Sequence, residues 1–485
     1  MARILLVVFL CMVFSGAHPL KDDHPNVVLI IADQMRGDAL GALNHPDIKT
    51  PFLDEMAKQG VLFRNFFVNN PVCVPSRMSM HSGQYPHQHG SISNKESIRF
   101  TSLDGTLLGY FKQKGYKLGW FGKDNHSYDR SLLDQTLDAN TSRKREAFRA
   151  YTPYIPPFWY SNTPWPQKEL FPVKTTDDAI EFIKDVEHED PFFMVLSLFD
   201  PHPPYFAPAA YTAHYPPDDL TLPPYINPEE LNPRLADQHR AFLYNEMPEA
   251  TLRATMAHYY AAIEWGIDYQ VGRLMKALET EGIADDTIVI FTSDHGDFMG
   301  EFGMVRKSMF MYDALLHVPL IWYAPGRIKA GHQTDVIAQG VDLYPTLLDM
   351  VEQGSPEHLP GRSLLPFMNG EPERNPDHVV FAGAGYNDLP EGYFASPEPP
   401  FYDPPSDNAK PFHSRILSLT TPPRHRTAMV RNAEWKLIMS ETHAPELYHM
   451  AGGWQEKKNL ANVAQHQAVL KELQHSLLSI WAWGD

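Results

Sequence analysis

A chain of 485 residues is long enough for one large α/β domain with a smaller one beside it, or for two to three domains. Its 21% charged and 43% hydrophobic residues are usual for a globular protein. The formal net charge of −18 argues against a nucleic-acid-binding protein, which would present a basic surface, but a local cluster of cations could still receive an anionic substrate.

The N-terminal segment, residues 1–17, has the pattern of a secretory signal peptide. Arg3 supplies the positive charge, and the apolar run at residues 4–14 is too short to span a bilayer. Small residues at 15–17 allow cleavage after Ala17, and no later run is apolar enough to cross a membrane. We therefore expect an exported protein, periplasmic or secreted, without stable membrane insertion.

Residues 26–33 form a continuous apolar run that ends in Asp33. A run without alternation is typical of a parallel strand buried on both faces, and catalytic groups gather at the carboxyl ends of such strands. Asp33 and Gln34 offer oxygen ligands that suit a hard cation such as calcium. The alternative for Asp33 is an ordinary turn or helix-capping residue.

A helix is predicted at residues 50–60, with Thr50 as its cap and Gly60 at its end, followed by a second strand at 61–68. That strand leads into Pro-Val-Cys-Val-Pro-Ser-Arg, in which Cys73 is the single cysteine left once the leader is removed. No internal disulfide is then possible. Apolar residues at helical spacing follow this segment, which places Cys73 near a helix N-terminus, where an anionic group is favoured.

Three further apolar runs end in polar residues. They are residues 115–122, before Lys123; residues 191–200, before a Pro-His-Pro-Pro turn that contains His202; and residues 286–293, before Asp294 and His295. A histidine at a strand end, held by prolines, is well placed for acid–base work. Alternatively, Lys123 is an exposed lysine at a strand end.

Outside these strands, the sequence predicts an aromatic loop at residues 151–171 and a long amphipathic helix at 254–281. A strand–turn–strand hairpin is expected at 428–438, and a final helix at 464–481.

The segment Cys73-Val74-Pro75-Ser76-Arg77, with Ser82-Gly83 beyond it, resembles the signature of the type I sulfatases. The family pattern is Cys-x-Pro-Ser-Arg followed by Thr-Gly, so Ser82 is a mild departure. Other segments also resemble the family, and together they cover nearly the whole mature chain: those around Lys123 and His202 and residues 292–307, 340–350, 361–364 and 446–461.

The resemblance implies that a formylglycine-generating enzyme oxidises Cys73 to formylglycine (3-oxoalanine), whose hydrated aldehyde is the nucleophile. It also implies one divalent ion per chain, expected to be Ca²⁺. The implied metal ligands are Asp33, Gln34, residue 73, Asp294 and His295.

The resemblance also implies roles in the reaction. Arg77 would hold the hydrated aldehyde; Lys123, His202 and Lys307 would hold the sulfate, and His202 or Lys307 would protonate the leaving oxygen. The family commonly reads Lys-Trp-His where this chain reads Lys-Asp-Asn-His, so the sequence leaves open whether Asn125 or His126 takes the hydroxyl proton.

The implied fold is an α/β sandwich of the alkaline-phosphatase type, with a mostly parallel sheet between helices. Residues 18–370 would form the catalytic domain, and 371–485 a smaller C-terminal α+β subdomain with a short antiparallel sheet. The implied activity is sulfate monoester hydrolysis, with a sulfated carbohydrate such as an algal polysaccharide or a glycosaminoglycan as substrate. The alternatives are a phosphonate monoester or phosphodiester hydrolase of the same superfamily and an inactive carbohydrate-binding relative. The sugar, the sulfate position and the oligomeric state stay open.

Overall fold

The computed structural model describes most of the chain between residues 24 and 482. The described residues are 24–91, 94, 103–123, 133–137, 160–163, 165–186, 190–227, 232–233, 235–236, 239, 247–352, 358–375, 377–385, 426–451 and 456–482. The expected signal peptide, Asn125, His126 and residues 151–159 of the expected aromatic loop lie outside them. None of the helices in these ranges is long and apolar enough to cross a membrane.

A central eight-stranded sheet has the order β12-β2-β11-β8-β1-β6-β3-β4. Strand β11 is antiparallel to both of its neighbours, and the other paired strands run parallel. The strands, in chain order, are β1 (Asn26–Asp33), β2 (Val61–Phe67), β3 (Lys117–Gly122), β4 (Gln135–Leu137), β6 (Phe192–Pro201), β8 (Thr287–Ser293), β11 (His317–Tyr323) and β12 (His332–Gln339). The expected mostly parallel sheet is confirmed.

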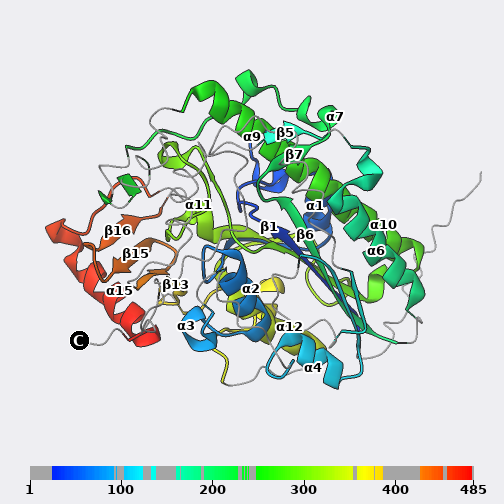
Figure 1. Cartoon of the computed structure of the whole chain (residues 1–485). Helices are drawn as coiled ribbons and strands as arrows, with labels where there is room; N and C mark the ends of the chain where they lie inside the picture. Colours follow the sequence, from blue (N-terminus) through cyan, green and yellow to red (C-terminus); the bar gives the residue numbers. More distant parts are fainter. Residues whose placement is uncertain are drawn as a thin grey trace, which may run out of the picture.

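Helices cover both faces of this sheet (Figure 1). Alternate residues of β1 enter separate cores, with Leu29 facing one and Ile30 the other. The Ile30 core includes residues of α1 (Pro51–Gln59), α6 (Phe171–Asp185), α9 (Glu249–Ile263) and α10 (Tyr269–Thr280). The Leu29 core includes residues of α2 (Cys73–Ser82), α4 (Leu107–Gln113) and α12 (Leu343–Glu352). Burial on both faces explains why β1 is a continuous apolar run.

The helix expected at 254–281 differs from the prediction. It begins at Glu249, and a π-helical segment, Glu264–Asp268, separates α9 from α10. Within this segment, the Asp268 carboxylate accepts hydrogen bonds from two backbone N–H groups in the first turn of α1, at 3.0 and 2.8 Å. Asp268 therefore caps α1. The Thr50 side chain, expected to be the cap, instead binds Asp54 and the Gly41 N–H.

A second, fully antiparallel sheet lies toward the C-terminus, with the order β13-β14-β15-β16. Its elements are β13 (Val380–Ala384), β14 (Thr427–Arg431), β15 (Trp435–Ser440) and β16 (Glu446–His449), and the final helix α15 (Gln467–Ile480) packs on it around a third core. This confirms the expected hairpin and antiparallel sheet. The sheet lies beside the segment that precedes Cys73, because Asn69 and Asn70 donate side-chain hydrogen bonds to carbonyl groups of β13.

Several 3-10 helical turns and other short elements complete the described part of the chain. The other short elements are α3 (Pro86–His89), α7 (Ala209–Thr212), α11 (Asp313–Leu316), α13 (Leu365–Met368), the parallel pair β5 (Tyr160–Asn162) and β7 (Tyr205–Ala207), and the antiparallel pair β9 (Phe298–Met299) and β10 (Val305–Arg306). The prediction of a loop at 151–171 was wrong for β5, which pairs with β7 although its sequence is short and polar.

Candidate active site

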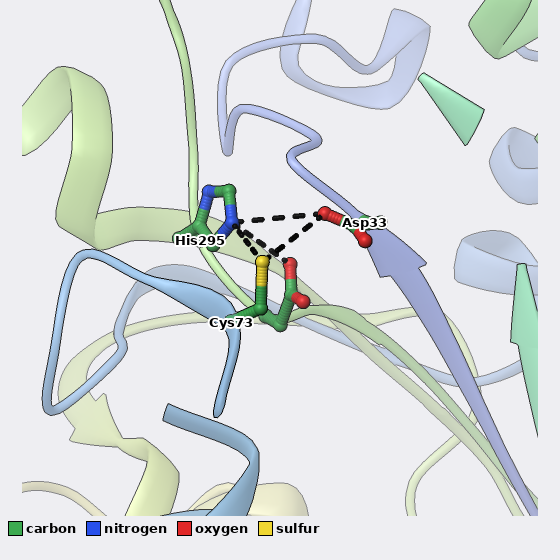
Figure 2. Close-up of side chains that lie close together, drawn as sticks. Asp33, Cys73 and His295 are labelled. Carbon is green, nitrogen blue, oxygen red and sulfur yellow. Dashed lines mark hydrogen bonds and ion pairs between the residues drawn. The ribbon is translucent and has the colours of Figure 1, made fainter. Parts of the chain in front are cut away.

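The candidate site lies at the carboxyl edge of the central sheet. Asp33 is the last residue of β1, Asp294 follows β8, and His202 follows β6. Because β1 lies between β6 and β8 and is parallel to both, the three strands end at the same edge. Cys73 is the first residue of α2, which confirms that it lies at a helix N-terminus, and its side chain points toward Asp33 and His295 (Figure 2).

Four buried side chains form a compact group of possible metal ligands: Asp33, Cys73, Asp294 and His295, with one donor atom of each within 4.8 Å of the others. The Cys73 Sγ lies 3.2 Å from His295 Nε2 and 3.8 Å from Asp33 Oδ1. The same nitrogen lies 3.6 Å from an oxygen of each aspartate. His295 Nδ1 is 2.8 Å from the Gly296 carbonyl oxygen, and a hydrogen donated there leaves the Nε2 lone pair facing the group.

Gln34, the fifth expected ligand, is fixed beside this group. Its backbone has a positive φ of 73°, and its N–H donates to Asp294 Oδ1 at 3.0 Å. Its side-chain Nε2 donates to Asp297 Oδ2 at 2.7 Å, an oxygen that also accepts the Tyr205 hydroxyl at 2.7 Å. Gln34 Oε1 is buried and has no hydrogen-bond partner in the described part of the chain. An unpaired buried acceptor next to two carboxylates and an imidazole fits a divalent cation.

Two lysines lie against the Cys73 sulfur. Lys307 Nζ is 2.8 Å from Sγ and 3.0 Å from His295 Nε2. Lys123 Nζ is 3.3 Å from Sγ and also forms an ion pair with Asp33. The residue-73 position is therefore enclosed by cations on one side and by the ligand group on the other.

Arg77 lies one turn further along α2 and is fully buried. Its Nε donates to Asp294 Oδ2 at 2.7 Å, and its Nη1 donates to Ser197 Oγ at 2.6 Å. Its Nη2 has no hydrogen-bond partner among the described residues. The guanidinium is thus fixed in place by Asp294 and Ser197.

These charges shift the pKa values of the buried acids. Burial and the Asp33 charge raise the pKa of the Cys73 thiol, but Lys123 and Lys307 outweigh them and lower it to about 6. Burial likewise raises the pKa of Asp33, and the charges of Lys123, His202 and Lys307 outweigh that effect and hold it well below the usual value. At neutral pH the site therefore holds an ionised carboxylate and favours an anion at residue 73.

His202 lies at the edge of the group and is half-buried. Its Nδ1 is 2.7 Å from the Pro203 carbonyl oxygen, and its ring centroid is 4.8 Å from that of Phe199. The Phe199 ring also faces Lys123, whose Nζ lies 5.3 Å from its centroid. The charge of His202 helps to lower the pKa of Asp33, so the structure brings His202 near the group.

Sequence reasoning gave no role to Ser197, Asp297 or Tyr205, which hold Arg77 and Gln34. A signal existed for Ser197, because a lone polar residue in the apolar run of β6 is unusual. Asp297 and Tyr205 lie four residues beyond the ends of β8 and β6, but their positions in the sequence do not reveal that Tyr205 holds Asp297 and Asp297 holds Gln34.

Comparisons with known proteins show which family and which fold this chain is similar to. A family model described as Sulfatase matches residues 25–353. An arylsulfatase of Clostridium perfringens (strain 13 / Type A) is 30% identical over 378 residues, which cover 70% of this chain and 77% of the relative. An ulvan-active sulfatase of Formosa agariphila is 30% identical over 387 residues, which cover 76% of this chain and 70% of the relative.

Solved structures show the same fold. The phosphonate monoester hydrolase of Agrobacterium radiobacter superposes with a TM-score of 0.75 at 26% identity, covering 94% of this chain and 95% of that one. A structure described as BT1596, a 2-O GAG sulfatase, superposes with a TM-score of 0.70 at 24% identity, covering 94% of this chain and 91% of that one.

Proposed function

Because the chain belongs to the sulfatase family, we propose that its buried site at residue 73 hydrolyses sulfate monoesters on a sulfated carbohydrate. The protein is a sulfuric ester hydrolase by family, and the likeness to an ulvan-active sulfatase supports a carbohydrate substrate. One observation carries the proposal. Two lysine ammonium groups and a group of possible metal-ligand atoms surround the Cys73 Sγ, the position of the proposed nucleophile.

The family implies a formylglycine and a divalent metal, and we propose that residue 73 is the converted position. The Cys73 sulfur then stands in for an oxygen of the hydrated aldehyde. Once formed, this group supplies a nucleophilic oxygen and a second hydroxyl whose loss of a proton allows sulfate to be released. A formylglycine-generating enzyme would be the maturation partner.

Asp33, Gln34, residue 73, Asp294 and His295 would hold the cation, which we propose to be one Ca²⁺ per chain. Four of these side chains offer oxygen after conversion, which suits calcium, whereas the histidine nitrogen is a less usual ligand for it. When bound, the cation would supply positive charge that polarises a sulfate oxygen and favours an anionic nucleophile.

The chain's own cations would bind and orient the substrate. Lys123 and Lys307, both within 3.3 Å of the position from which attack begins, would hold sulfate oxygens and neutralise their charge. Arg77, fixed through Asp294 and Ser197, would direct its unused Nη2 donor to the oxygen at residue 73.

Proton transfer completes the proposal. As the sulfur–oxygen bond to the sugar breaks, His202 or Lys307 would donate a proton to the departing oxygen. Asn125 or His126 would take the remaining hydroxyl proton, and both lie outside the described residues. We further propose that the protein is exported after removal of residues 1–17.

The test is ion chromatography of the sulfate, phosphonate and phosphate monoester anions released from a panel of substrates by protein made with a formylglycine-generating enzyme. The panel holds sulfated algal polysaccharides, their oligosaccharides, glycosaminoglycans, a phosphonate monoester and a phosphodiester. We expect sulfate release from one glycan class, and none from a Cys73→Ala variant. Hydrolysis of the phosphorus esters without release of sulfate would instead support the phosphonate monoester or phosphodiester hydrolase alternative. The 26% identity to a phosphonate monoester hydrolase is the reason for including these substrates. Release of no ion by protein whose mass shows the aldehyde would contradict hydrolysis and favour a binding protein.

A further inference from the structure

The described structure carries a thiol at residue 73, and this form of the site has a chemistry of its own. Its possible ligands are one thiol, one imidazole and two carboxylates. Thiolate and imidazole are the ligands that Zn²⁺ and similar soft or borderline ions prefer, whereas Ca²⁺ takes oxygen ligands almost exclusively.

The spacing of these atoms fits a tetrahedral ion. Metal–ligand bonds of 2.0–2.3 Å at tetrahedral angles place ligand atoms roughly 3.3–3.6 Å apart. The Cys73 sulfur is 3.2 Å from His295 Nε2, and that nitrogen is 3.6 Å from oxygens of Asp33 and Asp294. The sulfur is 3.8 Å from the Asp33 oxygen. All four ligand atoms lie within 4.8 Å of one another, so the wider pairs would have to close by up to about 1.2 Å to surround one Zn²⁺ at tetrahedral spacing.

The surroundings of the four ligands also suit an ion. All four side chains are buried, and the His295 ring is oriented by the Gly296 carbonyl, as the second nitrogen of a metal-bound histidine usually is. A thiolate and two carboxylates carry three negative charges, which the cations Lys123, Arg77 and Lys307 match in the metal-free chain. A bound ion would take over the role of the Lys307 ammonium, which lies 2.8 Å from the sulfur and 3.0 Å from His295 Nε2 and would have to leave both.

We propose that the unconverted chain binds one Zn²⁺ through Asp33, Cys73, Asp294 and His295, with the thiol proton released to solvent. Conversion of Cys73 then removes the sulfur ligand and shifts the preference of the site toward a hard cation. Maturation thus changes the metal that the site accepts as well as creating the nucleophile. Zn²⁺ binding by the unconverted chain is inferred from the described structure alone. The change of metal preference on conversion rests on the proposed function.

The first experiment titrates the unconverted, metal-free chain with Cd²⁺, which shares the thiolate preference of Zn²⁺ and gives a sulfur-to-cadmium charge-transfer absorption in the ultraviolet. A background carrying Cys11→Ser makes Cys73 the single source of that signal. We expect the absorption to saturate at one equivalent. Its absence from the folded protein would overturn the proposal.

The second experiment measures Zn²⁺ affinity by competition with a chromophoric chelator in the Cys73 chain and in Cys73→Ser, whose folding is checked by circular dichroism. Loss of a direct ligand should cost at least as much as loss of a supporting partner, so affinity should fall by more than about tenfold. A smaller fall would show that sulfur does not bind the ion. An Asp294→Asn variant, which keeps the thiol, should also lose affinity, and unchanged affinity there would equally contradict the proposed site.

The third experiment compares converted and unconverted chains for their Zn²⁺ to Ca²⁺ affinity ratio, which should fall by more than about tenfold on conversion. An unchanged ratio would overturn the shift in preference. A converted chain that shows the shift but releases no sulfate would leave the metal inference standing and remove the proposed function.

Discussion

At the scale of single residues, the site depends on side chains that orient other side chains. The side-chain amide of Gln34 is held by the hydrogen bond from its Nε2 to Asp297, and the backbone carbonyl oxygen of Gln34 accepts the Tyr259 hydroxyl at 2.9 Å. Asp297 is fixed in turn by Tyr205. A side-chain amide can rotate by half a turn and exchange its oxygen and nitrogen. Because Asp297 accepts a hydrogen bond, the Gln34 Nε2 faces Asp297, and the Gln34 Oε1 is left to bind the cation.

Replacing Asp297 by Ala removes that acceptor and leaves the Gln34 amide free to turn. We expect the Ca²⁺ affinity of the converted protein, measured by isothermal titration calorimetry, to fall by about 10–100-fold. Asp335→Ala, at a carboxylate whose side chain is 75% exposed, is the matched control and should leave the affinity unchanged. Equal affinities in the two variants would mean that Asp297 does not orient Gln34.

The residues of the site were predictable only in part. The short segment around Cys73 and Arg77 indicated the nucleophile through its resemblance to the sulfatase signature. The ends of the apolar runs placed Asp33, His202 and Asp294 at the carboxyl edge of the central sheet. The supporting bonds were not predictable, because a bond such as Gln34 to Asp297 joins residues 263 positions apart and depends on rotamers that no local pattern encodes.

At the scale of elements, the buried strands were the most predictable part of the fold. A strand buried on both faces must be apolar throughout, so β1, β6 and β8 stood out as continuous runs. The break in the long helix was not predictable. Its π-helical segment brings Asp268 to the first turn of α1, a contact made across the fold rather than along the chain.

Asp268 gives this contact a dependence on pH. Burial raises the pKa of its carboxyl from 3.8 to about 8, so the folded chain holds the proton more tightly than the unfolded chain. The stability from this group is complete below about pH 4 and is lost as the pH rises toward 8. Asp268→Asn keeps an oxygen acceptor for both N–H groups and removes the charge.

We therefore expect the unfolding midpoint of the original chain to fall more between pH 5 and pH 8 than that of Asp268→Asn, by differential scanning fluorimetry. Parallel curves for the two proteins would show that folding does not raise the pKa of Asp268.

At the scale of the whole molecule, a buried ion network joins the C-terminal sheet to the catalytic part of the chain. Lys436 on β15 bonds Asp313 of α11 and Glu456, each at 2.6 Å, and Arg431 on β14 pairs with the same aspartate. The side chains of this network are at most 4% exposed. Removing one partner from such a network leaves buried charge without compensation.

Lys436→Met should therefore lower the free energy of unfolding by about 3–5 kcal/mol, measured by denaturant titration with an unchanged m-value. Lys276→Met removes a similar side chain from an exposed pair with Glu279 and should leave the unfolding midpoint nearly unchanged. If both variants unfold alike, the network does not hold the two sheets together.

One measurement directly tests the central claim that residue 73 must carry the aldehyde for sulfate hydrolysis. Preparations of the protein with different degrees of conversion are analysed by mass spectrometry of the peptide that contains residue 73, and each is assayed for sulfate release on the same glycan. We predict that specific activity is proportional to the converted fraction, with a line through the origin. Undiminished activity in a preparation without the aldehyde would contradict the account.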